Sequence, residues 1–222
     1  QGYVPLIAPK LETISIQTSL QSLEFIGISK LCSVDLSNCS QLASLRIMNC
    51  KFLSFATFSV EKLTNLTVLE IESCLISEVP KGLEELSRLR KLNLSKNRIS
   101  NIADVIIILT ELIEIDLSYN TLSYVQSLHR LTKLSVLNLL GNSLKSVPVV
   151  SSGVVHLLLD SEGMNGRIDN IDVLIAANLN QLEKLALAGH LLKTIPREIG
   201  YMTQLRVINL KNCRIETIPE NS

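Results

Sequence analysis

The sequence predicts an α/β repeat fold. The expected form is a right-handed, curved solenoid with a parallel β-sheet on its concave face and 3-10, helical or irregular segments on its convex side. Two observations predict it. The phrase L-x-x-L-x-L-x-x-N-x-L, with Ile in place of some Leu, occurs at 89–99, 112–122 and 134–144, so its starts lie 23 and 22 residues apart. Aromatic residues make up only 4% of the chain, which suits a core of many thin aliphatic layers.

The register of the repeats follows from eight apolar starting residues. These are Leu42, Leu66, Leu89, Leu112, Leu134, Val154, Leu182 and Leu205. Positions one, four and six of each repeat are apolar, and side chains alternate between the two faces of a strand. We therefore expect positions four and six to point into the core, and positions three, five and seven to point outward.

Proline recurs at position fifteen, where each repeat is expected to turn toward the convex side. Each of these prolines follows Val or Ile. Proline fixes φ and donates no backbone hydrogen bond, so it suits a turn outside the sheet. The column supports the register and contains Pro80, Pro148, Pro196 and Pro219.

The register is ambiguous near the N-terminus, because the phrase recurs there every 11 residues. It starts at Leu20, Leu31 and Leu42. Eleven residues are too few for one full layer. The favoured register places the segments that start at Leu20 and Leu42 in the concave sheet and residues 31–39 on the convex side. The alternative places residues 31–36 in the concave sheet, with the previous repeat starting at Leu11.

The repeats predict one domain over residues 1–222. Residues 1–19 are expected to form an irregular N-terminal segment or cap, and residues 20–222 about nine repeats. A longer step separates two of the repeat starts, so residues 160–181 form an insert. Within the insert, apolar residues at helical spacing predict a convex helix over residues 168–179.

The repeat phrases resemble the leucine-rich-repeat family, with mixed repeats of 22–24 residues. The phrase IPREIG at 195–200 is similar to intracellular repeats of Ras-pathway scaffolds. The proline-free repeats that start at Leu89 and Leu112 are similar to phosphatase-regulator or internalin-type repeats. The resemblance covers about residues 42–222. It implies a protein-binding module, and it implies that small GTPases, phosphatase subunits or other signalling proteins are plausible partners.

Position nine of the repeat accounts for most of the cysteines. Cys50, Cys74 and Cys213 lie there, where the family accepts Asn or Cys, and Cys39 does so if its own phrase is counted. We expect these thiols to point inward. The alternative is a disulfide between Cys50 and Cys74, because neighbouring layers lie about 4.8 Å apart. An odd number of cysteines favours a cytoplasmic location. Three glycosylation sequons, at Asn38, Asn65 and Asn93, instead favour an extracellular or cell-surface location.

The sequence shows no catalytic set. His190 lies at position nine, where a structural role is expected, and there is no phosphate-binding glycine loop, paired-cysteine motif or nucleophile elbow. One acidic stretch is either a cation site or, as we favour, a solvated loop. It contains Asp160, Glu162, Asp169 and Asp172. We therefore predict no enzymatic activity, no cofactor and no metal.

The outward strand positions form columns that predict a partner-binding surface. Its first part is polar and acidic, and its second part is apolar. A contiguous exposed apolar patch marks an interface, unless the insert covers it or the exposure is incidental. The predicted partner-binding residues are Glu70, Glu72 and Asp116 in the polar part, and Tyr119, Leu140, Leu158, Ala186 and Ala188 in the apolar part.

These features predict a non-enzymatic protein–protein interaction module that binds an unidentified protein through the concave face, as part of a larger signalling or scaffold protein. The alternatives are an extracellular receptor or adhesin domain that binds a peptide or glycan, and a regulatory arm of an enzyme. The formal net charge is zero and no apolar run could span a bilayer, which argues against nucleic acid and membrane insertion. The last repeat lacks a polar cap, so we expect its edge to contact a flanking domain or a second copy.

Overall fold

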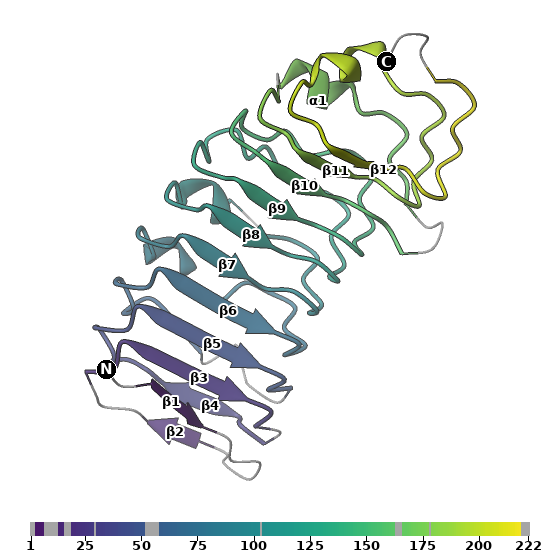
Figure 1. Ribbon diagram of the computed structural model, residues 1–222. Coiled ribbons are helices and arrows are strands. Elements are labelled where there is room, and N and C mark those ends of the chain that lie inside the picture. Colours follow the sequence, from purple (N-terminus) through teal and green to yellow (C-terminus); the bar gives the residue numbers. More distant parts are fainter. Residues whose placement is uncertain are drawn as a thin grey trace. The chain divides into compact units, whose positions relative to one another are not determined.

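The chain forms two compact units, Gln1–Leu112 (unit 1) and Ile113–Ser222 (unit 2), in the computed structural model. The structure describes residues 3–6, 13–15, 19–28, 30–51, 58–102, 104–162, 166–177 and 179–218. Each unit is a stack of layers, and each layer contributes one short strand to a parallel sheet (Figure 1). The repeat fold predicted from the sequence is therefore confirmed in each unit, while the single domain over 1–222 stays a prediction. We call the outward side of each sheet the strand face.

Unit 1 places five strands side by side in the order β1, β3, β5, β6 and β7. Leu23 lies beside Leu45, which lies beside Leu69, so equivalent repeat positions are in register. Two 3-10 helices, η1 (Leu83–Glu85) and η2 (Ile106–Ile108), lie in the return segments. The strand bounds are Tyr3–Leu6 (β1), Ser22–Ile26 (β3), Ser44–Met48 (β5), Val68–Glu72 (β6) and Lys91–Asn93 (β7).

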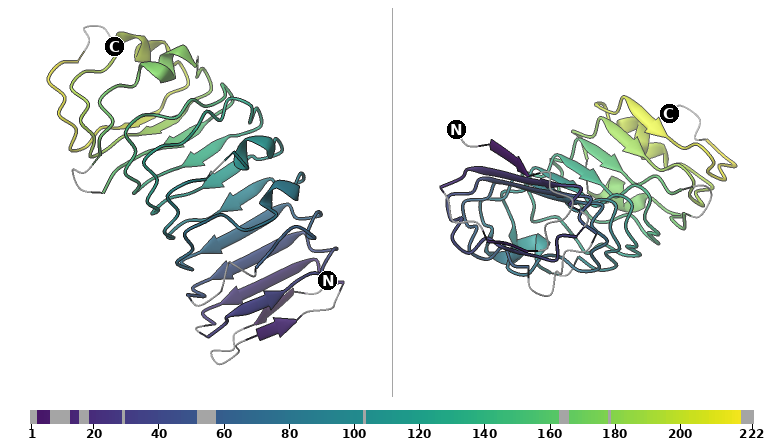
Figure 2. Two further views of the ribbon diagram at one scale, coloured as in Figure 1. Left: turned by 180° about the vertical axis from the view of Figure 1, so that it is seen from behind. Right: turned by 90° about the horizontal axis from the view of Figure 1, so that it is seen from below.

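The N-terminal register is the favoured one. β3 pairs with β5, and residues 31–39 lie outside the main sheet, on the return side of the layer (Figure 2). The alternative that places residues 31–36 in the concave sheet is wrong, because β4 (Ser33–Asp35) pairs with β2 (Thr13–Ser15) in a separate two-stranded sheet. The structure also differs from the irregular segment expected over 1–19. Both β1 and β2 form there, from residues such as Val4 and Ile14 that favour strands.

Unit 2 repeats the same arrangement with strands β8 to β12 in sequence order. Leu157 lies beside Leu137 on one side and Leu185 on the other, which again aligns equivalent positions. The elements are β8 (Glu114–Asp116), β9 (Val136–Asn138), β10 (His156–Leu158), α1 (Asp172–Ala176), β11 (Lys184–Ala186), η3 (Arg197–Tyr201) and β12 (Val207–Asn209).

The helix predicted over 168–179 is shorter in the structure, where α1 spans five residues. The chain turns just before it, because the backbone N–H of Asp172 donates to the side-chain oxygen of Asn170 at 2.6 Å. Ile168 is extended instead, and its carbonyl accepts a hydrogen bond from Leu191 at 2.9 Å. Of the five apolar residues at helical spacing, four are buried, namely Ile168, Ile171, Leu174 and Leu179, while Ile175 is half-buried.

Aliphatic side chains at positions four and six fill the core of both units, as predicted. At position four, Leu69, Leu92, Ile115 and Leu137 are all 0% exposed. At position six, Ile71, Leu94, Leu117 and Leu139 are also 0% exposed. The predicted turn prolines Pro80 and Pro148 are buried and Pro196 is half-buried, while Pro219 lies outside the described residues. The alternation of inward and outward positions is therefore confirmed in these layers, while in the last layer Ile208, at position four, is 39% exposed.

Buried asparagines at position nine join neighbouring layers through the backbone. The side-chain nitrogen of Asn97 donates to the carbonyls of Ile71 and Leu94 at 2.7 and 2.9 Å. Its oxygen accepts from the backbone N–H groups of Cys74 and Ile76 at 3.0 and 3.3 Å. In unit 2, Asn142 binds the preceding layer in the same way. These bonds satisfy polar groups that the short strands leave unpaired.

Position eight, which follows the strand, is left-handed in most layers, a feature that was not predicted from the sequence. In eight described layers the φ angle at this position lies between 54° and 78°. Glycine reaches this region without strain, while other residues adopt it less often. Tyr119 has the same backbone conformation as the equivalent residues of these layers, so its positive φ angle is a feature of the repeat and not of a local site. The residues are Gly27, Asn49, Ser73, Lys96, Tyr119, Gly141, Gly189 and Asn212.

Candidate protein-binding surface

In several layers, the side chain at position five accepts a hydrogen bond from the end of its own strand. Oxygens of Asp116, Asn138 and Asn209 each accept from the backbone N–H two residues later, at 2.9–3.2 Å. In unit 1, Asn93 does the same for Ser95 at 2.9 Å. A short polar side chain at this position therefore has a structural role. An aliphatic residue at the same position gives up that hydrogen bond.

Two consecutive layers of unit 2 depart from this rule, with Leu158 on β10 and Ala186 on β11. The backbone N–H of Ala188 is satisfied from the preceding layer, where Oδ1 of Asp160 accepts its hydrogen bond at 2.6 Å. The other oxygen, Oδ2, accepts from Nδ2 of Asn209 at 3.0 Å. Asp160 thus links three layers. It keeps the backbone satisfied while an aliphatic side chain occupies position five of the Ala188 layer.

The departure coincides with a hollow of about 460 Å³ on the strand face of unit 2, over β9 to β12. A hollow of this size accommodates one or two side chains of a partner. Ala186 is only 3% exposed and contributes to its base, whereas Val207 is 48% exposed. We call this feature the apolar hollow. Its lining includes Leu140, Leu158, Asp160, Lys184, Ala186 and Val207.

The structure brings three of the predicted apolar residues, Leu140, Leu158 and Ala186, together in the hollow. Ala188 and Tyr119 lie outside its lining. The Tyr119 ring rests against Gly141 of the next layer, where an added Cβ would approach ring atom Cδ1 to 2.7 Å. The ring is still 41% exposed, so Tyr119 is an accessible aromatic group on the strand side of unit 2.

Asp116, predicted as an acidic contact, is engaged within the chain. Its Oδ1 accepts hydrogen bonds from the backbone N–H and the hydroxyl of Ser118, at 2.9 and 2.7 Å. Its Oδ2 accepts from Nδ2 of Asn138 at 3.0 Å. Asp116 is half-buried and helps to hold β8 beside β9.

Apart from Asp160, the described residues of the insert lie away from the apolar hollow. Helix α1 is on the return side of its layer, where Ile175 faces Tyr201 and Met202 near η3. Gly166 lies along the end of the next layer, and its N–H donates to the carbonyl of Gly189 at 3.0 Å. In the part of the insert that the structure describes, only Asp160 lines the hollow. The described residues thus leave the apolar surface open.

Two exposed lysines accompany the apolar hollow. Lys184 is the first residue of β11 and position three of its repeat; it lies beside His156 of β10 in register and lines the hollow. Lys211 follows β12 at position seven. Within the described residues, neither ammonium group forms an ion pair with a carboxylate of the chain. Lys184 was not among the predicted partner-binding residues, because none of those was taken from position three of a repeat.

The strand face of unit 1 is different, because its charges pair with one another. Arg46 on β5 lies between Glu24 on β3 and Glu70 on β6, with nitrogen–oxygen distances of 2.8 Å to each. Lys91 on β7 also reaches Glu70, at 3.2 Å. The Glu24 residue is only 4% exposed, so this network is partly removed from water. Four neighbouring strands are thereby connected by alternating charges.

The acidic character predicted around Glu70 and Glu72 is offset by these pairs. Lys96, at position eight, forms an ion pair with Glu72 at 2.7 Å. The acidic prediction left out the cations Lys91 and Lys96, at positions three and eight, and therefore overestimated the negative charge of this face. Both carboxylates are engaged within the chain, and their role in partner binding stays a prediction.

The cysteines at position nine have the predicted structural role, and all five cysteines, which lie within the described residues, are free thiols. The Cys74 sulfur donates to the carbonyls of Glu72 and Ile47 at 3.2 and 3.5 Å. Burial raises the pKa of Cys74 to about 12 and also raises the pKa of Cys50. Both groups are therefore uncharged at neutral pH and poor nucleophiles. The alternative of a Cys50–Cys74 disulfide is wrong.

His190 also has the predicted inward role at position nine. Its Nε2 lies 2.8 Å from the carbonyl of Leu159, and the backbone N–H of Ile168 donates to Nδ1 at 3.4 Å. This pair of contacts fits a neutral ring with its proton on Nε2. Burial lowers the pKa of His190, which favours the same neutral form.

The acidic stretch considered as a cation site is dispersed in the structure. Asp160 binds Ala188 and Asn209, while Asp172 accepts a hydrogen bond from Nδ2 of Asn170 at 2.9 Å. Within the described residues, no three His, Cys, Asp or Glu side chains are grouped as metal ligands. Likewise, none of the helices described is both long and apolar enough to cross a membrane.

Stacked parallel-strand layers with an open strand face define a protein of the repeat-solenoid class. The sequence model of the leucine rich repeat family matches residues 40–99 and 87–144. The human leucine-rich repeat and IQ domain-containing protein 4 is 35% identical over 98 residues, a match that covers 44% of this chain and 18% of that protein. The matched region is thus less than a fifth of that relative. These findings confirm the resemblance: residues 40–144 of the chain are leucine-rich repeats.

Solved structures share the fold. A leucine-rich-repeat protein of Leptospira interrogans has a TM-score of 0.73 at 24% identity, over 91% of this chain and 56% of that one. The functional domain of InlJ from Listeria monocytogenes, which includes a cysteine ladder, has a TM-score of 0.74 at 20% identity, over 91% and 43%. An internalin, InlF, from Listeria monocytogenes has a TM-score of 0.61 at 19% identity, over 91% and 68%. At these identities the likeness concerns the fold alone.

Proposed function

We propose that this chain is a non-enzymatic protein–protein interaction module that binds its partner at the apolar hollow on the strand face of unit 2. Leucine-rich-repeat proteins generally serve as protein–protein interaction modules. The observation that carries the proposal is the occupancy of position five. Leu158 and Ala186 stand where four other layers have side chains that bind the backbone, and Asp160 replaces a missing acceptor. Functional sites typically break a local structural rule and compensate for it elsewhere, as the position-five residues and Asp160 do here.

The energetic contribution of the hollow follows from its apolar area. Leu140 and Leu158 are half-buried and Val207 is exposed, so a partner side chain seated among them removes further apolar surface from water. Full burial of one such side chain is worth about 1.5–3 kcal/mol. Two or three side chains of this kind at the centre of an interface are enough to form a hot spot. The surrounding polar groups then exclude water and set orientation.

The strand face holds these side chains in place before the partner arrives. Leu158 lies on β10, which pairs on both sides with parallel strands, and Ala186 lies on β11, which does the same. Asp160 fixes the strand ends to one another through its two hydrogen bonds. A surface fixed by backbone pairing loses little conformational freedom on binding, so more of the contact energy appears as affinity.

The other predicted contacts have secondary roles in this proposal. Tyr119 and Ala188 lie on the same side of unit 2 as the hollow and are proposed as rim contacts. Asp116 is proposed to act mainly by holding β8 and β9 together. Glu70 and Glu72 are proposed as minor contacts, because Arg46, Lys91 and Lys96 already neutralise them.

We propose a cytoplasmic location from the state of the cysteines. All five cysteines are free thiols, and the sulfur of Cys74 donates to backbone carbonyls instead of bonding to a second sulfur. The sequon at Asn65 is also engaged, since its side-chain nitrogen donates to the Ser40 carbonyl at 2.8 Å and its oxygen accepts from Arg88 at 2.7 Å. Thiol titration of the denatured protein should find five reactive groups. Disulfides or an attached glycan would instead place the protein outside the cell.

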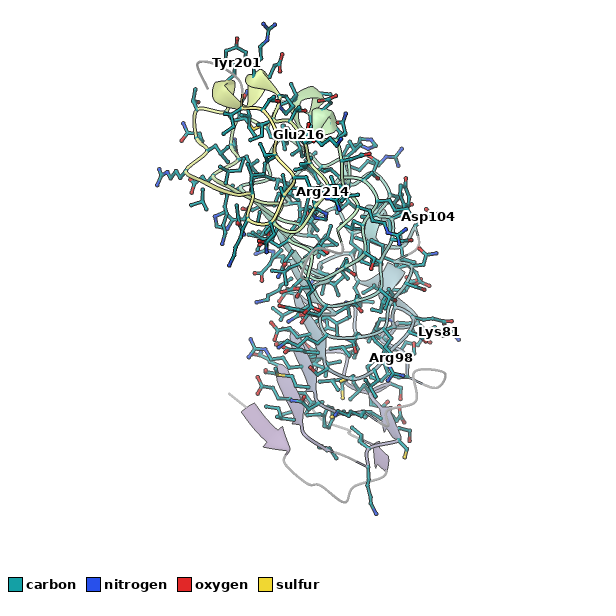
Figure 3. The ribbon with its side chains drawn as sticks, turned by 90° about the vertical axis from the view of Figure 1, so that its right-hand side faces the viewer. Lys81, Arg98, Asp104, Tyr201, Arg214 and Glu216 are labelled. Atoms are coloured by element: carbon teal, nitrogen blue, oxygen red, sulfur yellow. The ribbon has the colours of Figure 1, made fainter. Side chains whose placement is uncertain are left out.

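Site-specific photocrosslinking tests the proposed surface. A photoreactive amino acid replaces Leu158 in one variant and Tyr201 in a matched control. Tyr201 is 73% exposed on η3, beside α1 and apart from the strands (Figures 1 and 3). In a lysate of the source cells, the variant at 158 is expected to capture one discrete protein that the variant at 201 does not. Equal capture from both positions, or capture from 201 alone, contradicts the proposed surface.

A further inference from the structure

We infer that the partner contributes an acidic segment to this site, with an apolar side chain in the hollow and carboxylates beside Lys184 and Lys211. The inference rests on the proposed function and specifies the chemistry of the partner. Three features of unit 2 carry it: the two unpaired cations, the engaged state of the nearby carboxylates, and the distance between the lysines.

The first feature is the presence of two cations that form no ion pair with any described residue. Lys184 and Lys211 are exposed, and neither forms an ion pair with a described residue. Lys184 lines the apolar hollow directly. A partner side chain that fills the hollow therefore brings its own neighbouring residues close to this ammonium group. A carboxylate in that place gains an attractive interaction that is strengthened by the exclusion of water.

The second feature is the state of the acidic groups on the same face. Asp160 is the acidic residue that lines the hollow, and both of its oxygens accept hydrogen bonds from the chain. It is therefore turned toward Ala188 and Asn209. A basic partner would have to compete with these bonds and approach Lys184 as well. The face of β10 to β12 favours negative charge in the partner.

In unit 1, where only minor partner contacts are proposed, the strand-face charges pair within the chain. There Arg46 and Lys91 both bind Glu70, and Lys96 binds Glu72. The exposed lysines of unit 2 stand in contrast to these paired cations. Exposed lysines are common on protein surfaces, but here Lys184 lines the apolar hollow proposed as the contact surface, and Lys211 lies two residues after Asn209, which also lines it.

The third feature is the spacing of the two lysines across the sheet. Lys184 is at position three of one layer and Lys211 at position seven of the next. With a rise of about 3.3 Å per residue and about 4.8 Å between strands, their Cα atoms are about 14 Å apart. Extended chain covers that distance in about four residues. The expected motif is thus an extended segment of about five residues, with an acidic residue toward each end and an apolar residue between them.

Selection from a random peptide library tests the inference with a defined probe. Phage that display random twelve-residue peptides are selected on the whole chain, and enriched peptides are synthesised and measured by fluorescence anisotropy. We expect enriched peptides to combine Asp or Glu with Leu, Ile, Phe or Trp. Their affinity should fall at least tenfold in Lys184→Glu, and should fall steeply with added salt.

A matched charge variant controls for net charge. Lys145→Glu makes the same change at an exposed lysine that does not line the hollow, and it should leave peptide affinity within about twofold. Lys211→Glu should weaken binding, and the Lys184→Glu, Lys211→Glu pair should weaken it further. Circular dichroism of each variant confirms that the fold is retained.

The possible results separate the inference from the proposed function. Peptides that need Leu158 but are basic or neutral, or that bind Lys184→Glu normally, overturn the acidic-partner inference and leave the binding surface standing. Peptides that bind Leu158→Arg as well as the native chain, or a selection that enriches no Leu158-dependent peptide, count against the hollow as the binding surface. Acidic peptides that need both Leu158 and Lys184 support both statements.

Discussion

The carboxylate of Asp160 accepts a hydrogen bond at 2.6 Å from the backbone N–H of Ala188, 28 residues later in the chain. In four other layers this N–H is satisfied by the residue at position five of the same strand. Asp160 therefore frees position five of the next layer to be the small, apolar Ala186. The apolar hollow depends on this arrangement, in which Asp160 of one layer accepts the hydrogen bond that a position-five side chain accepts in other layers.

Replacement of Asp160 by Ala should destabilise unit 2 by about 1.5–3 kcal/mol, because a charged acceptor is lost and the Ala188 N–H is left unpaired. Urea denaturation measures the loss. Asp169→Ala removes an exposed carboxylate from the same insert and should change stability by less than about 0.5 kcal/mol. Equal effects of the two variants would show that the Asp160 hydrogen bonds contribute nothing specific.

Replacement of Arg46 by Ala should destabilise unit 1 by about 1–3 kcal/mol. The change leaves Glu24, which is 4% exposed, without its cation, and it removes one of two cations from Glu70. Breaking a fully buried pair costs about 3–5 kcal/mol, and the partial exposure of Arg46 reduces that figure. Thermal denaturation at low and high salt measures the effect. Lys96→Ala, which breaks the exposed pair with Glu72, should cost under about 1 kcal/mol.

Replacement of Asn97 by Ala should cost about 2–4 kcal/mol, since the backbone groups of Cys74, Ile76 and Ile71 all lose a partner. Asn97→Cys should cost less. In the preceding layer the Cys74 sulfur already binds two backbone carbonyls from the same position. Chemical denaturation of the two variants checks the order. A cysteine variant no more stable than the alanine variant would contradict the equivalence of Asn and Cys at position nine.

Acidification should destabilise unit 2 through His190. Burial lowers the pKa of this residue below its ordinary value of 6.5, so protons bind the unfolded chain more readily than the folded one. Above pH 6.5 the ring is neutral in both the folded and the unfolded chain, and the folded state keeps its full stability. As the pH falls from 6.5 through the folded-state pKa, protons bind the unfolded chain first and the free energy of unfolding decreases. Melting temperatures at about pH 7.5 and about pH 5.5 measure the loss. His190→Asn, the residue found at this position in other layers, should reduce the drop. If the melting temperature of His190→Asn falls as much as that of the native chain, other titratable groups cause the loss of stability.

Most of the fold could be predicted from the sequence because every layer buries apolar side chains at the same repeat positions. The position-four residues Leu92 and Ile115 were assigned to the core from spacing alone, and both are fully buried. The N-terminal strands were harder to assign. A phrase that recurs every 11 residues is compatible with a strand in the main sheet and with a strand on the return side of the layer. Helix α1 was predicted too long, because the Asn170 turn and the extended pairing of Ile168 leave no trace in hydrophobic periodicity.

The candidate surface was predicted in part. Alternation placed Leu140 and Leu158 on the strand face, but it did not show that Asp160 replaces the position-five acceptor, because that bond joins residues 28 apart. The ion pairs of unit 1 were missed for a similar reason. Lys91 and Lys96 reach carboxylates of the preceding layer, so their effect is visible only when outward columns are compared across layers.

The affinity of the photocrosslinked partner for a double variant, Leu140→Arg with Leu158→Arg, tests the central claim most directly. Both side chains line the hollow and neither fills the core, so the circular dichroism spectrum should match that of the native chain. Two charged side chains in an apolar contact should weaken binding at least a hundredfold. A folded double variant that binds the purified partner with native affinity would contradict the assignment of the strand face of unit 2 as the binding surface.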